Sequence, residues 1–272
     1  MAILEAKSSR FWTLVKQNAE VKQIATGFAF TEGPVFSRRG FLLFSDIPNE
    51  KILRWERGEL TTFRTASNKA NGLTFDHQGR LLAAEGGGRV TRTEKDGAIT
   101  VLASEGLKGP NDLVYSIDGS LYFSDLPGSR VYQITRERSG VGGAPPRGEV
   151  RVVAETPAPN GVALSPNQQR IYVADVKTNM VSIHDIASNG TLGPRRDFAP
   201  LRVDGLKTDE AGNVWMASRD GIYVYDAAGS HLGTIKTDEG PSNCCWGAGG
   251  LYVTARKSVY LVPVQSAGTR TF

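Results

Sequence analysis

Six short segments of the sequence each begin with an acid or its amide and then enter a run of β-favouring residues. We call these six first residues the lead residues: Glu32, Asn71, Asn111, Asn160, Asp204 and Asn243. Carboxylate and amide oxygens are the ligands preferred by hard divalent cations such as Ca²⁺, Mg²⁺ and Mn²⁺, and Zn²⁺ also accepts them. If the fold brings the lead residues together, they predict a site for a divalent cation.

A simpler interpretation is that each lead residue only opens a strand, because Asn-Gly and Asp-Gly pairs are common turn formers. The lead residues are separated by 39, 40, 49, 44 and 39 positions, which is the spacing of an internal repeat. Six recurrences at one structural position, each an acid or an amide, favour a functional ring over six unrelated turns.

A second set of polar residues follows the lead residues by fourteen or fifteen positions: Asp46, Glu85, Asp125, Asp175 and Ser218. Each ends the second strand of its unit, which runs antiparallel to the first, so both sets belong to one face. Two roles remain open for them. They contact substrate or orient the lead residues, or they cap strand ends by accepting backbone N–H groups.

Each repeat unit predicts four strands, because β-favouring runs alternate with turn residues such as the glycines found eight positions after four of the lead residues. The sixth unit lacks a fourth strand, while a spare strand at residues 20–26 precedes the first unit. Since open sheet edges promote aggregation, we expect this spare strand to complete the last unit. The sequence therefore predicts an all-β fold, a six-bladed β-propeller forming a single domain over residues 1–272.

Two segments fall outside the regular repeat. Residues 1–20 form an N-terminal extension, in which Phe11 to Val15 predict a short helix that covers part of the propeller. Residues 139–148 of the third unit, with Pro145 and Pro146, predict a loop insertion within a blade.

Composition excludes several classes of protein. The net charge of +4 is scattered, and the longest basic runs are pairs such as Arg38-Arg39, which argues against a nucleic-acid partner. No apolar run approaches the roughly 18–20 residues that span a bilayer, and the N-terminus lacks a signal-peptide pattern. The two cysteines, Cys244 and Cys245, are adjacent and cannot link distant parts of the fold. These features predict a cytoplasmic protein without a membrane partner.

The sequence lacks the motifs of several other kinds of catalytic site. The three histidines, His77, His184 and His231, have no zinc-binding spacing and no Gly-x-Ser-x-Gly nucleophile motif to serve. The run Gly86 to Gly88 is not followed by the Lys-Ser/Thr pair of a phosphate-binding loop.

Four motifs in chain order point to a known family: Thr31-Glu32-Gly33-Pro34, Gly109-Pro110-Asn111-Asp112, Pro159-Asn160-Gly161 and Asp204-Gly205. They resemble those of the family that contains regucalcin (senescence marker protein), bacterial gluconolactonases and squid diisopropyl fluorophosphatase. The resemblance extends from about Gly27 to Val262. It implies a six-bladed propeller with one catalytic divalent cation, Ca²⁺ being the first choice, held by Glu32, Asn160 and Asp204.

The same resemblance bears on substrate binding. Asn111 matches a position that either ligates the metal or contacts substrate and water. Regucalcins carry a substrate-binding arginine two residues before this asparagine, where the present chain has Gly109, preceded by Lys108. The bacterial sugar-lactonase branch is therefore the more similar one.

The resemblance implies a metal-dependent hydrolase that converts a sugar lactone, an aldonolactone, into its aldonic acid. The cation would polarise the lactone carbonyl while water attacks, with Asp204 as the general base. Asn71 and Asn111 are candidates for binding sugar hydroxyls, as are Glu85 and Asp125. The alternatives are hydrolysis of an organophosphate or another lactone at the same site, and a non-catalytic propeller that binds proteins. We expect a monomer or weak homo-oligomer.

Overall fold

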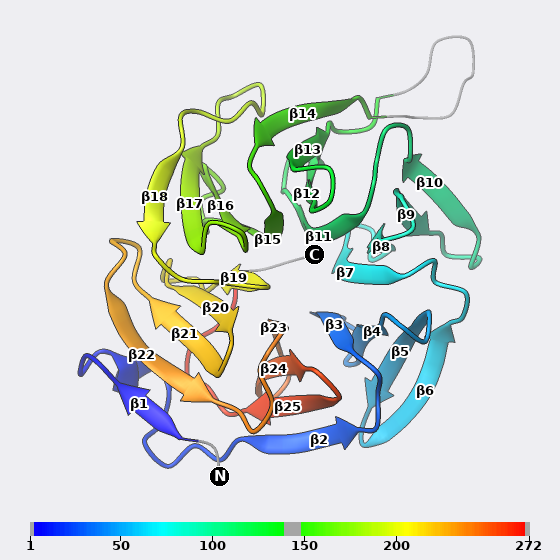
Figure 1. Cartoon of the computed structure of the whole chain (residues 1–272). Coiled ribbons are helices and arrows are strands. Elements are labelled where there is room, and N and C mark those ends of the chain that lie inside the picture. The colour runs from blue at the N-terminus through cyan, green and yellow to red at the C-terminus, as the bar shows by residue number, and fades with distance from the viewer. Residues whose placement is uncertain (1–2, 139–147, 270–272) are drawn as a thin grey trace.

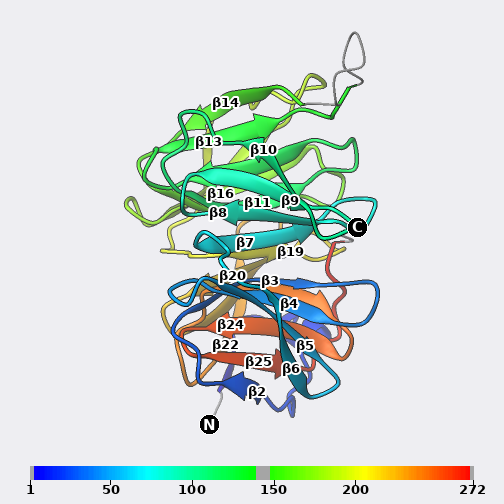
Figure 2. The ribbon, with the colours of Figure 1, turned by 90° about the vertical axis from the view of Figure 1, so that its right-hand side faces the viewer.

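The computed structural model describes residues 3–138 and 148–269. Its strands form six antiparallel sheets, which are arranged as blades around a central axis (Figure 1). Seen from the side, the sheets stand next to one another around that axis (Figure 2). The six-bladed β-propeller is therefore confirmed.

In the first three blades the strands follow one another from the axis outward. Blade one consists of β3 (Thr31–Phe36), β4 (Leu42–Asp46), β5 (Lys51–Glu56) and β6 (Glu59–Arg64). Blade two consists of β7 (Ala70–Phe75), β8 (Leu81–Glu85), β9 (Arg89–Thr93) and β10 (Ile99–Ala103). Blade three consists of β11 (Pro110–Tyr115), β12 (Leu121–Asp125), β13 (Arg130–Ile134) and β14 (Val150–Glu155).

The last three blades keep this order, and blades five and six each add one strand from the N-terminus. Blade four consists of β15 (Pro159–Leu164), β16 (Arg170–Asp175), β17 (Met180–Asp185) and β18 (Arg196–Ala199). Blade five consists of β19 (Leu206–Thr208), β20 (Val214–Ser218), β21 (Gly221–Tyr225), β22 (His231–Lys236) and β1 (Leu4–Ala6). Blade six consists of β23 (Asn243–Gly247), β24 (Gly250–Ala255), β25 (Ser258–Val262) and β2 (Lys22–Thr26).

The ring closes through β2, which pairs antiparallel with β25, with Lys22 opposite Leu261 and Thr26 opposite Ser258. The last blade thus takes its outermost strand from the N-terminus, as the sequence predicts. Closure joins both ends of the repeat in one sheet and covers β25, which would otherwise be the outer edge of a three-stranded blade.

The innermost strands β3, β7, β11, β15, β19 and β23 contact one another in a closed circle around the axis. Tight turns connect them to the second strands. In blade two, the Asp76 carboxylate accepts the backbone N–H groups of Gln78 and Arg80, and Gly79 takes a φ of 73° that favours glycine. Asp209 accepts the corresponding N–H groups of Ala211 and Asn213 in blade five.

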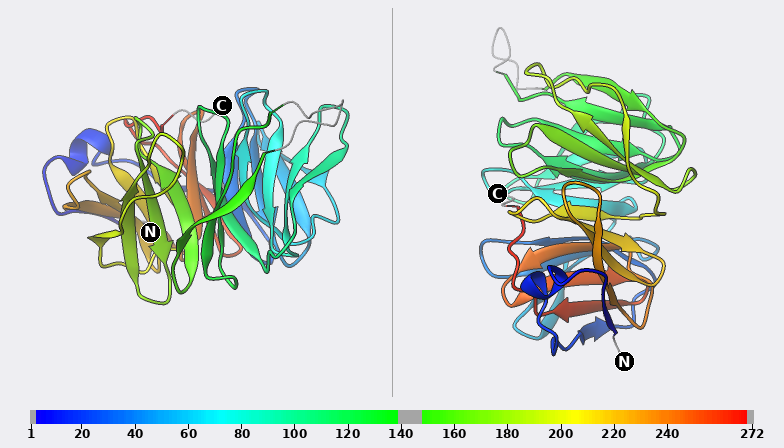
Figure 3. Two further views of the ribbon diagram at one scale, coloured as in Figure 1. Left: turned by 90° about the horizontal axis from the view of Figure 1, so that it is seen from above. Right: turned by 90° about the vertical axis from the view of Figure 1, so that its left-hand side faces the viewer.

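The N-terminal extension differs in part from the prediction. The expected short helix is present as α1 (Phe11–Leu14), but it is preceded by β1, a fifth strand that pairs with β22 of blade five. Figure 3 shows β1 and α1 on the outside of blade five. Phe11 and Val15 are buried and pack with Trp215 and Val262, so the extension seals the contact between blades five and six.

The hydrophobic core is divided into clusters between and within the blades. Between blades one and two, for example, Leu43 and Ile52 pack against Leu73 and Phe75. The predicted insertion at residues 139–148 lies, apart from Gly148, outside the described residues. Within the described ranges, no helix is long and apolar enough to cross a membrane.

Candidate active site

The innermost strands of four blades have an irregular ladder at the lead residue. In β3, the register of pairing with β4 shifts between Glu32 and Val35. Equivalent shifts fall between Ala70 and Leu73, Pro110 and Leu113, and Pro159 and Val162. Irregularities of this kind interrupt the alternation of side chains along a strand and re-aim them. Asn71, Asn111 and Asn160 are thereby left out of the ladder, whereas Glu32 still pairs with Ser45.

Hydrogen bonds between neighbouring blades fix the backbone at this level. The Ser45 hydroxyl of blade one donates to the Asn71 carbonyl of blade two at 2.8 Å, and Ser124 donates in the same way to the Asn160 carbonyl at 2.5 Å. The Gly161 N–H donates to the Asp204 carbonyl at 2.8 Å. A Cβ atom on Gly161 would lie 2.5 Å from that carbonyl oxygen, so glycine is required for this close approach.

Six polar side chains from five blades gather near the axis. We call them the axial cluster: Glu32, Asp112, Asn160, Asp204, Lys207 and Asn243. Asn243 Nδ2 donates to Glu32 Oε2 at 3.1 Å and lies 3.5 Å from Asp112 Oδ2. The same Asp112 oxygen lies 3.3 Å from Lys207 Nζ, and the Asn160 side chain hydrogen-bonds to Asp204. The contacts extend across the ring, because they join blades one, three, five and six.

The carboxylates of the axial cluster repel one another. Burial is the main cause that raises the pKa of Glu32 well above its usual range, and the charges of Asp204 and Asp112 raise it further. Burial likewise raises the pKa of Asp204 to about 6, and Asp112 adds to this, while the hydrogen bond from Asn160 and the charge of Arg202 partly oppose it. Both shifts make the ionised form of these carboxylates more costly unless a cation balances their charge.

Lys207 is the cation that the chain itself supplies. Burial opposes its charge, but the facing groups Asp112, Cys244 and Glu32 together raise its pKa above the usual value. Lys207 is therefore an ammonium ion at neutral pH. Its single charge cannot balance Glu32, Asp112 and Asp204 together.

The residues present fit a divalent cation. The Asn160 side chain hydrogen-bonds to Asp204, whose charge in turn acts on Glu32, and all three side chains carry oxygen atoms that can bind a cation. The Oδ1 atom of Asn71 in blade two is buried and, among the described residues, has no hydrogen-bond partner. The uncompensated charge and the orphaned acceptor are the features expected of a region that would hold a cation and a polar ligand. Within the described ranges, no three acidic, histidine or cysteine side chains form a metal cluster by themselves, so the amides are needed.

Four of the six lead residues, Glu32, Asn160, Asp204 and Asn243, are thus brought together by direct contacts or charge. Asn71 and Asn111 lie at the same level of neighbouring innermost strands and are only partly buried.

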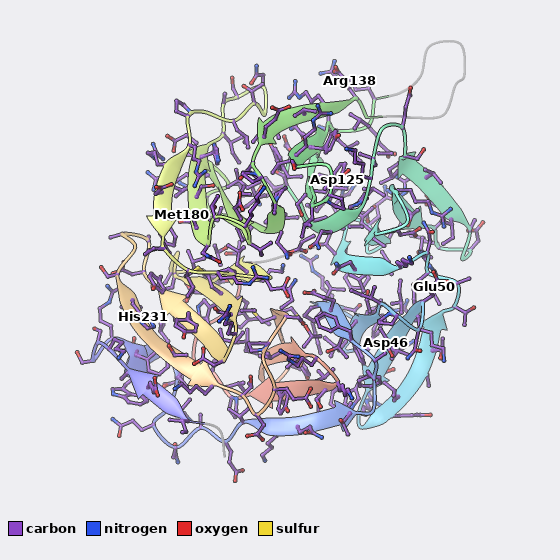
Figure 4. All side chains as sticks on the ribbon, viewed as in Figure 1. Asp46, Glu50, Asp125, Arg138, Met180 and His231 are labelled. Carbon is purple, nitrogen blue, oxygen red and sulfur yellow. The ribbon has the colours of Figure 1, made fainter. Side chains whose placement is uncertain are left out.

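The second set of predicted residues is placed differently. Asp46, Glu85, Asp125 and Asp175, which we call the outer acids, pair across the ladder with Thr31, Ala70, Pro110 and Pro159, each just before a lead residue. They share the face of the axial cluster, as the antiparallel pairing predicts. Figure 4 shows Asp46 and Asp125 within their blades, away from the axis.

Each outer acid is occupied by donors from its own surroundings. Asp46 accepts the N–H groups of Ala29 and Phe30, and Asp175 accepts those of Lys177 and Thr178. Glu85 is fully buried and binds the side chains of Arg64, Arg89, Asn68 and Thr91. Ser218 donates to the Arg202 carbonyl. Contacts of this kind fix the loops around the channel mouth.

Asp125 and Gly109 belong to one such loop. The backbone N–H groups of Lys108 and Gly109 donate to the Asp125 carboxylate at 2.8 and 2.9 Å. A Cβ atom on Gly109 would lie 2.9 Å from Cγ of Pro127, so the loop has no room for a side chain there. The position at which the resemblance expects an arginine is closed by local packing.

Asp112 and Lys207 are the functional candidates that the sequence analysis missed. Asp112 directly follows the lead residue Asn111, and regular alternation would turn the two side chains to opposite faces. Lys207 is the only cationic residue in the six innermost strands, all of which lie within the described ranges. A lysine in an innermost strand was therefore the feature of the sequence that could have identified Lys207 as a site residue.

The cysteines and histidines lie outside this chemistry. Cys244 and Cys245 are free thiols, and burial raises the pKa of Cys244 to about 12, which leaves it unreactive. His184 is buried in blade four and bonds to the Gly193 carbonyl. A cavity of about 1190 Å³ lies between blades two and three beside the turns, and its ion pairs, such as Arg80 with Asp76, balance one another.

Residues 30–257 match the family described as SMP-30/Gluconolactonase/LRE-like region. The chain belongs to this family. A gluconolactonase from Zymomonas mobilis is 27% identical over 96% of this chain and 86% of its own length. A pentonolactonase from Haloferax volcanii is 24% identical over 77% of this chain and 74% of its own length.

Solved structures agree with this membership in the gluconolactonase family. A gluconolactonase from Xanthomonas campestris superposes with a TM-score of 0.86 at 26% identity, covering 96% of this chain and 94% of its own. A calcium-binding regucalcin from Agrobacterium tumefaciens gives a TM-score of 0.78 at 18% identity, covering 93% of this chain and 96% of its own. The second likeness shows a shared fold.

Proposed function

We propose that this protein hydrolyses a sugar lactone to the corresponding aldonic acid with the aid of one divalent cation. The observation that carries the proposal is the axial cluster, in which buried carboxylates face one another beside amide oxygens. The names of the relatives from Zymomonas mobilis and Haloferax volcanii support the substrate class.

Glu32, Asn160 and Asp204 are the proposed ligands, and Ca²⁺ is the first choice of ion because all donors are hard oxygens. When bound, the cation would act as a Lewis acid toward the lactone carbonyl. The side chains of the protein would carry out the other steps, namely orientation of the ligands and proton transfer. Glu32 is held by Asn243 at 3.1 Å and by the Gly33 N–H, which fixes its orientation.

Asp204 is the proposed general base. It would accept a proton from the water that attacks the carbonyl carbon and return it to the ring oxygen when the C–O bond breaks. Its position beside Asn160 and near Arg202 suits this role, because both favour the ionised form that accepts the proton. Opening the ring yields a carboxylic acid, which releases one proton at neutral pH.

Asn71 and Asn111 are the proposed contacts to sugar hydroxyls. The orphaned Oδ1 of Asn71 is an acceptor that a substrate hydroxyl can satisfy. The carboxylates of Glu85 and Asp125 are engaged by four side chains and by three backbone N–H groups respectively. The role we propose for these two is to order the loops that carry the substrate contacts.

The test is a pH-indicator assay of acid release from a panel of aldonolactones, run on chelator-stripped protein with and without Ca²⁺, Mg²⁺, Mn²⁺ or Zn²⁺. Hydrolysis that disappears on chelation and returns with one ion per chain is expected. Full activity in a verifiably metal-free preparation contradicts the metal requirement. The panel includes a phosphotriester and a non-sugar lactone, because preferential turnover of either would favour the alternative hydrolase, and no turnover at all would favour the protein-binding propeller.

A further inference from the structure

Lys207 occupies an unusual place for a lysine, in the middle of the innermost strand β19 within the ring. Its side chain is 19% exposed, and its Nζ lies 3.3 Å from Oδ2 of Asp112, whose side chain is 3% exposed. That oxygen lies 3.5 Å from Asn243 Nδ2, which in turn donates to Glu32 Oε2. The ammonium is therefore connected to a proposed metal ligand through two intervening side chains.

The balance of charges in the axial cluster explains why a lysine lies at this position. The axial cluster contains three carboxylates, Glu32, Asp112 and Asp204, and buried charges are stable only when they are compensated. One divalent cation together with the Lys207 ammonium would neutralise all three. A divalent cation without Lys207 would leave one carboxylate, Asp112, unpaired inside the ring.

We propose that Lys207 acts as a built-in cation that neutralises Asp112 and restricts the channel to a single divalent ion. It is a positioning residue, since it holds Asp112 and, through Asn243, the orientation of Glu32. The inference rests on the proposed metal site and adds to it the reason why that site takes one ion. Without the ammonium, Asp112, Glu32 and the Asn243 amide would offer oxygen ligands to a second ion.

The test compares Lys207→Met, which keeps the aliphatic side chain and removes the charge, with Lys207→Arg, which keeps the charge. Chelator-stripped proteins are titrated with Ca²⁺ in a calorimeter, without substrate. The parent and Lys207→Arg are expected to bind one ion per chain, and Lys207→Met two. The double variant Lys207→Met/Asp112→Asn, which lacks the freed carboxylate, is expected to bind one again.

Thermal stability without metal gives a second measurement. Breaking a buried ion pair from one side leaves the other charge uncompensated, so metal-free Lys207→Met should melt roughly 10 °C below the parent, and Ca²⁺ should restore most of this loss. A Lys207→Met chain that folds only when Ca²⁺ is added also supports the proposal, because the second ion replaces the ammonium.

The outcomes separate this inference from the proposed function. If the parent and Lys207→Met both bind one ion with equal affinity, the role of Lys207 is refuted while the metal-dependent hydrolase stands. A parent that binds two ions also refutes it. A parent that binds none overturns the metal site and this inference together. If Lys207→Met stays unfolded in saturating Ca²⁺ while the double variant folds, the ammonium only stabilises the fold and the proposal is wrong.

Discussion

The axial cluster and the outer acids are two sets of carboxylates on the same face of the propeller. Asp175 accepts the backbone N–H groups of Lys177 and Thr178 and the Thr156 hydroxyl, and together these bonds hold its pKa below the usual value against the effect of burial. Asp204 is partly buried, and its pKa is raised to about 6. The hydrogen bonds of the chain stabilise the charge of Asp175. The charge of Asp204 is not compensated in the same way.

Whether the chain compensates the charge of a carboxylate therefore distinguishes structural from functional acids better than residue type does. An acid that receives two or three N–H groups stabilises its loop and has little left for a ligand. An acid that faces other acids is costly to the fold, and such a cost is typical of sites that bind a cation or perform chemistry. The predictions below test whether Asp204 and Asp175 behave as opposites.

The largest expected effect is on catalysis. Asp204→Asn keeps the shape and one ligating oxygen but removes the proton acceptor, so hydrolysis should fall about 10²–10⁴-fold even at saturating metal. Asp175→Asn should stay within a few-fold of the parent. The measurement is the rate of acid release as a function of metal concentration.

Asn160→Ala is the control for metal binding alone, because an amide ligates but does not accept a proton at neutral pH. Its defect should be recovered more completely by added metal than that of Asp204→Asn. A return of Asp204→Asn to within a few-fold of the parent turnover at saturating metal would refute the role of Asp204 as base.

Stability should respond in the opposite sense. In chelator at pH 7.5, Asp175→Asn should lower the free energy of unfolding by about 1–3 kcal/mol, since it weakens hydrogen bonds to a charged acceptor and leaves donors poorly satisfied. Asp204→Asn should raise it, because it relieves repulsion among buried acids. Urea unfolding measures both, and a loss of stability in both variants would show that the two sets of acids are equivalent.

The sequence predicted the strands, the closing strand β2 and the lead residues, because these depend on local patterns that recur six times. It could not reveal the direction of individual side chains. Asp112 reaches the axial cluster because the β11 ladder is irregular between Pro110 and Leu113, which no turn or periodicity signal encodes. β1 was missed for a related reason, since Leu4–Ala6 is three residues long and forms a strand only by adding to β22.

The outer acids illustrate the same limit. Their spacing placed them on the correct face, but the sequence alone left open whether they would bind substrate or cap loops. The answer depends on whether the neighbouring backbone points its N–H groups inward, as Lys108 and Gly109 do toward Asp125. Such geometry arises only when the loops around the channel are folded together.

The pH dependence of stability should also distinguish the two sets. In the metal-free protein, the folded state binds more protons at Asp204 than the unfolded state between about pH 4 and pH 6, because its folded pKa is raised to about 6. The free energy of unfolding should therefore fall as pH rises through this window, by at most about 1.4 kcal/mol per pH unit for this group. Asp175, whose folded pKa is lowered, contributes stability that is lost as pH falls through that lower pKa.

Urea unfolding in chelator across pH 3–8 measures these slopes. Asp204→Asn should reduce the fall between pH 4 and pH 6, and Asp175→Asn should change only the acidic end of the profile. An Asp204→Asn profile that keeps the full parental slope would show that the raised pKa belongs to other groups.

The smallest expected effect concerns Asn71, which shares an irregular strand start with the lead residues of blades one, three and four but carries an unsatisfied oxygen. Asn71→Ala should raise KM several-fold, corresponding to one lost hydrogen bond of about 1 kcal/mol, with little change in kcat or in melting temperature. Asn213→Ala is the matched control, since the buried Asn213 amide donates to Asp209 at 2.8 Å in a turn on the opposite side of its blade. The control should lower the melting temperature and leave KM unchanged, because it breaks a satisfied bond remote from the axis. If Asn71→Ala destabilises the protein as much as Asn213→Ala and leaves KM as it was, Asn71 is a structural residue, and the lead residue of blade two belongs with the outer acids.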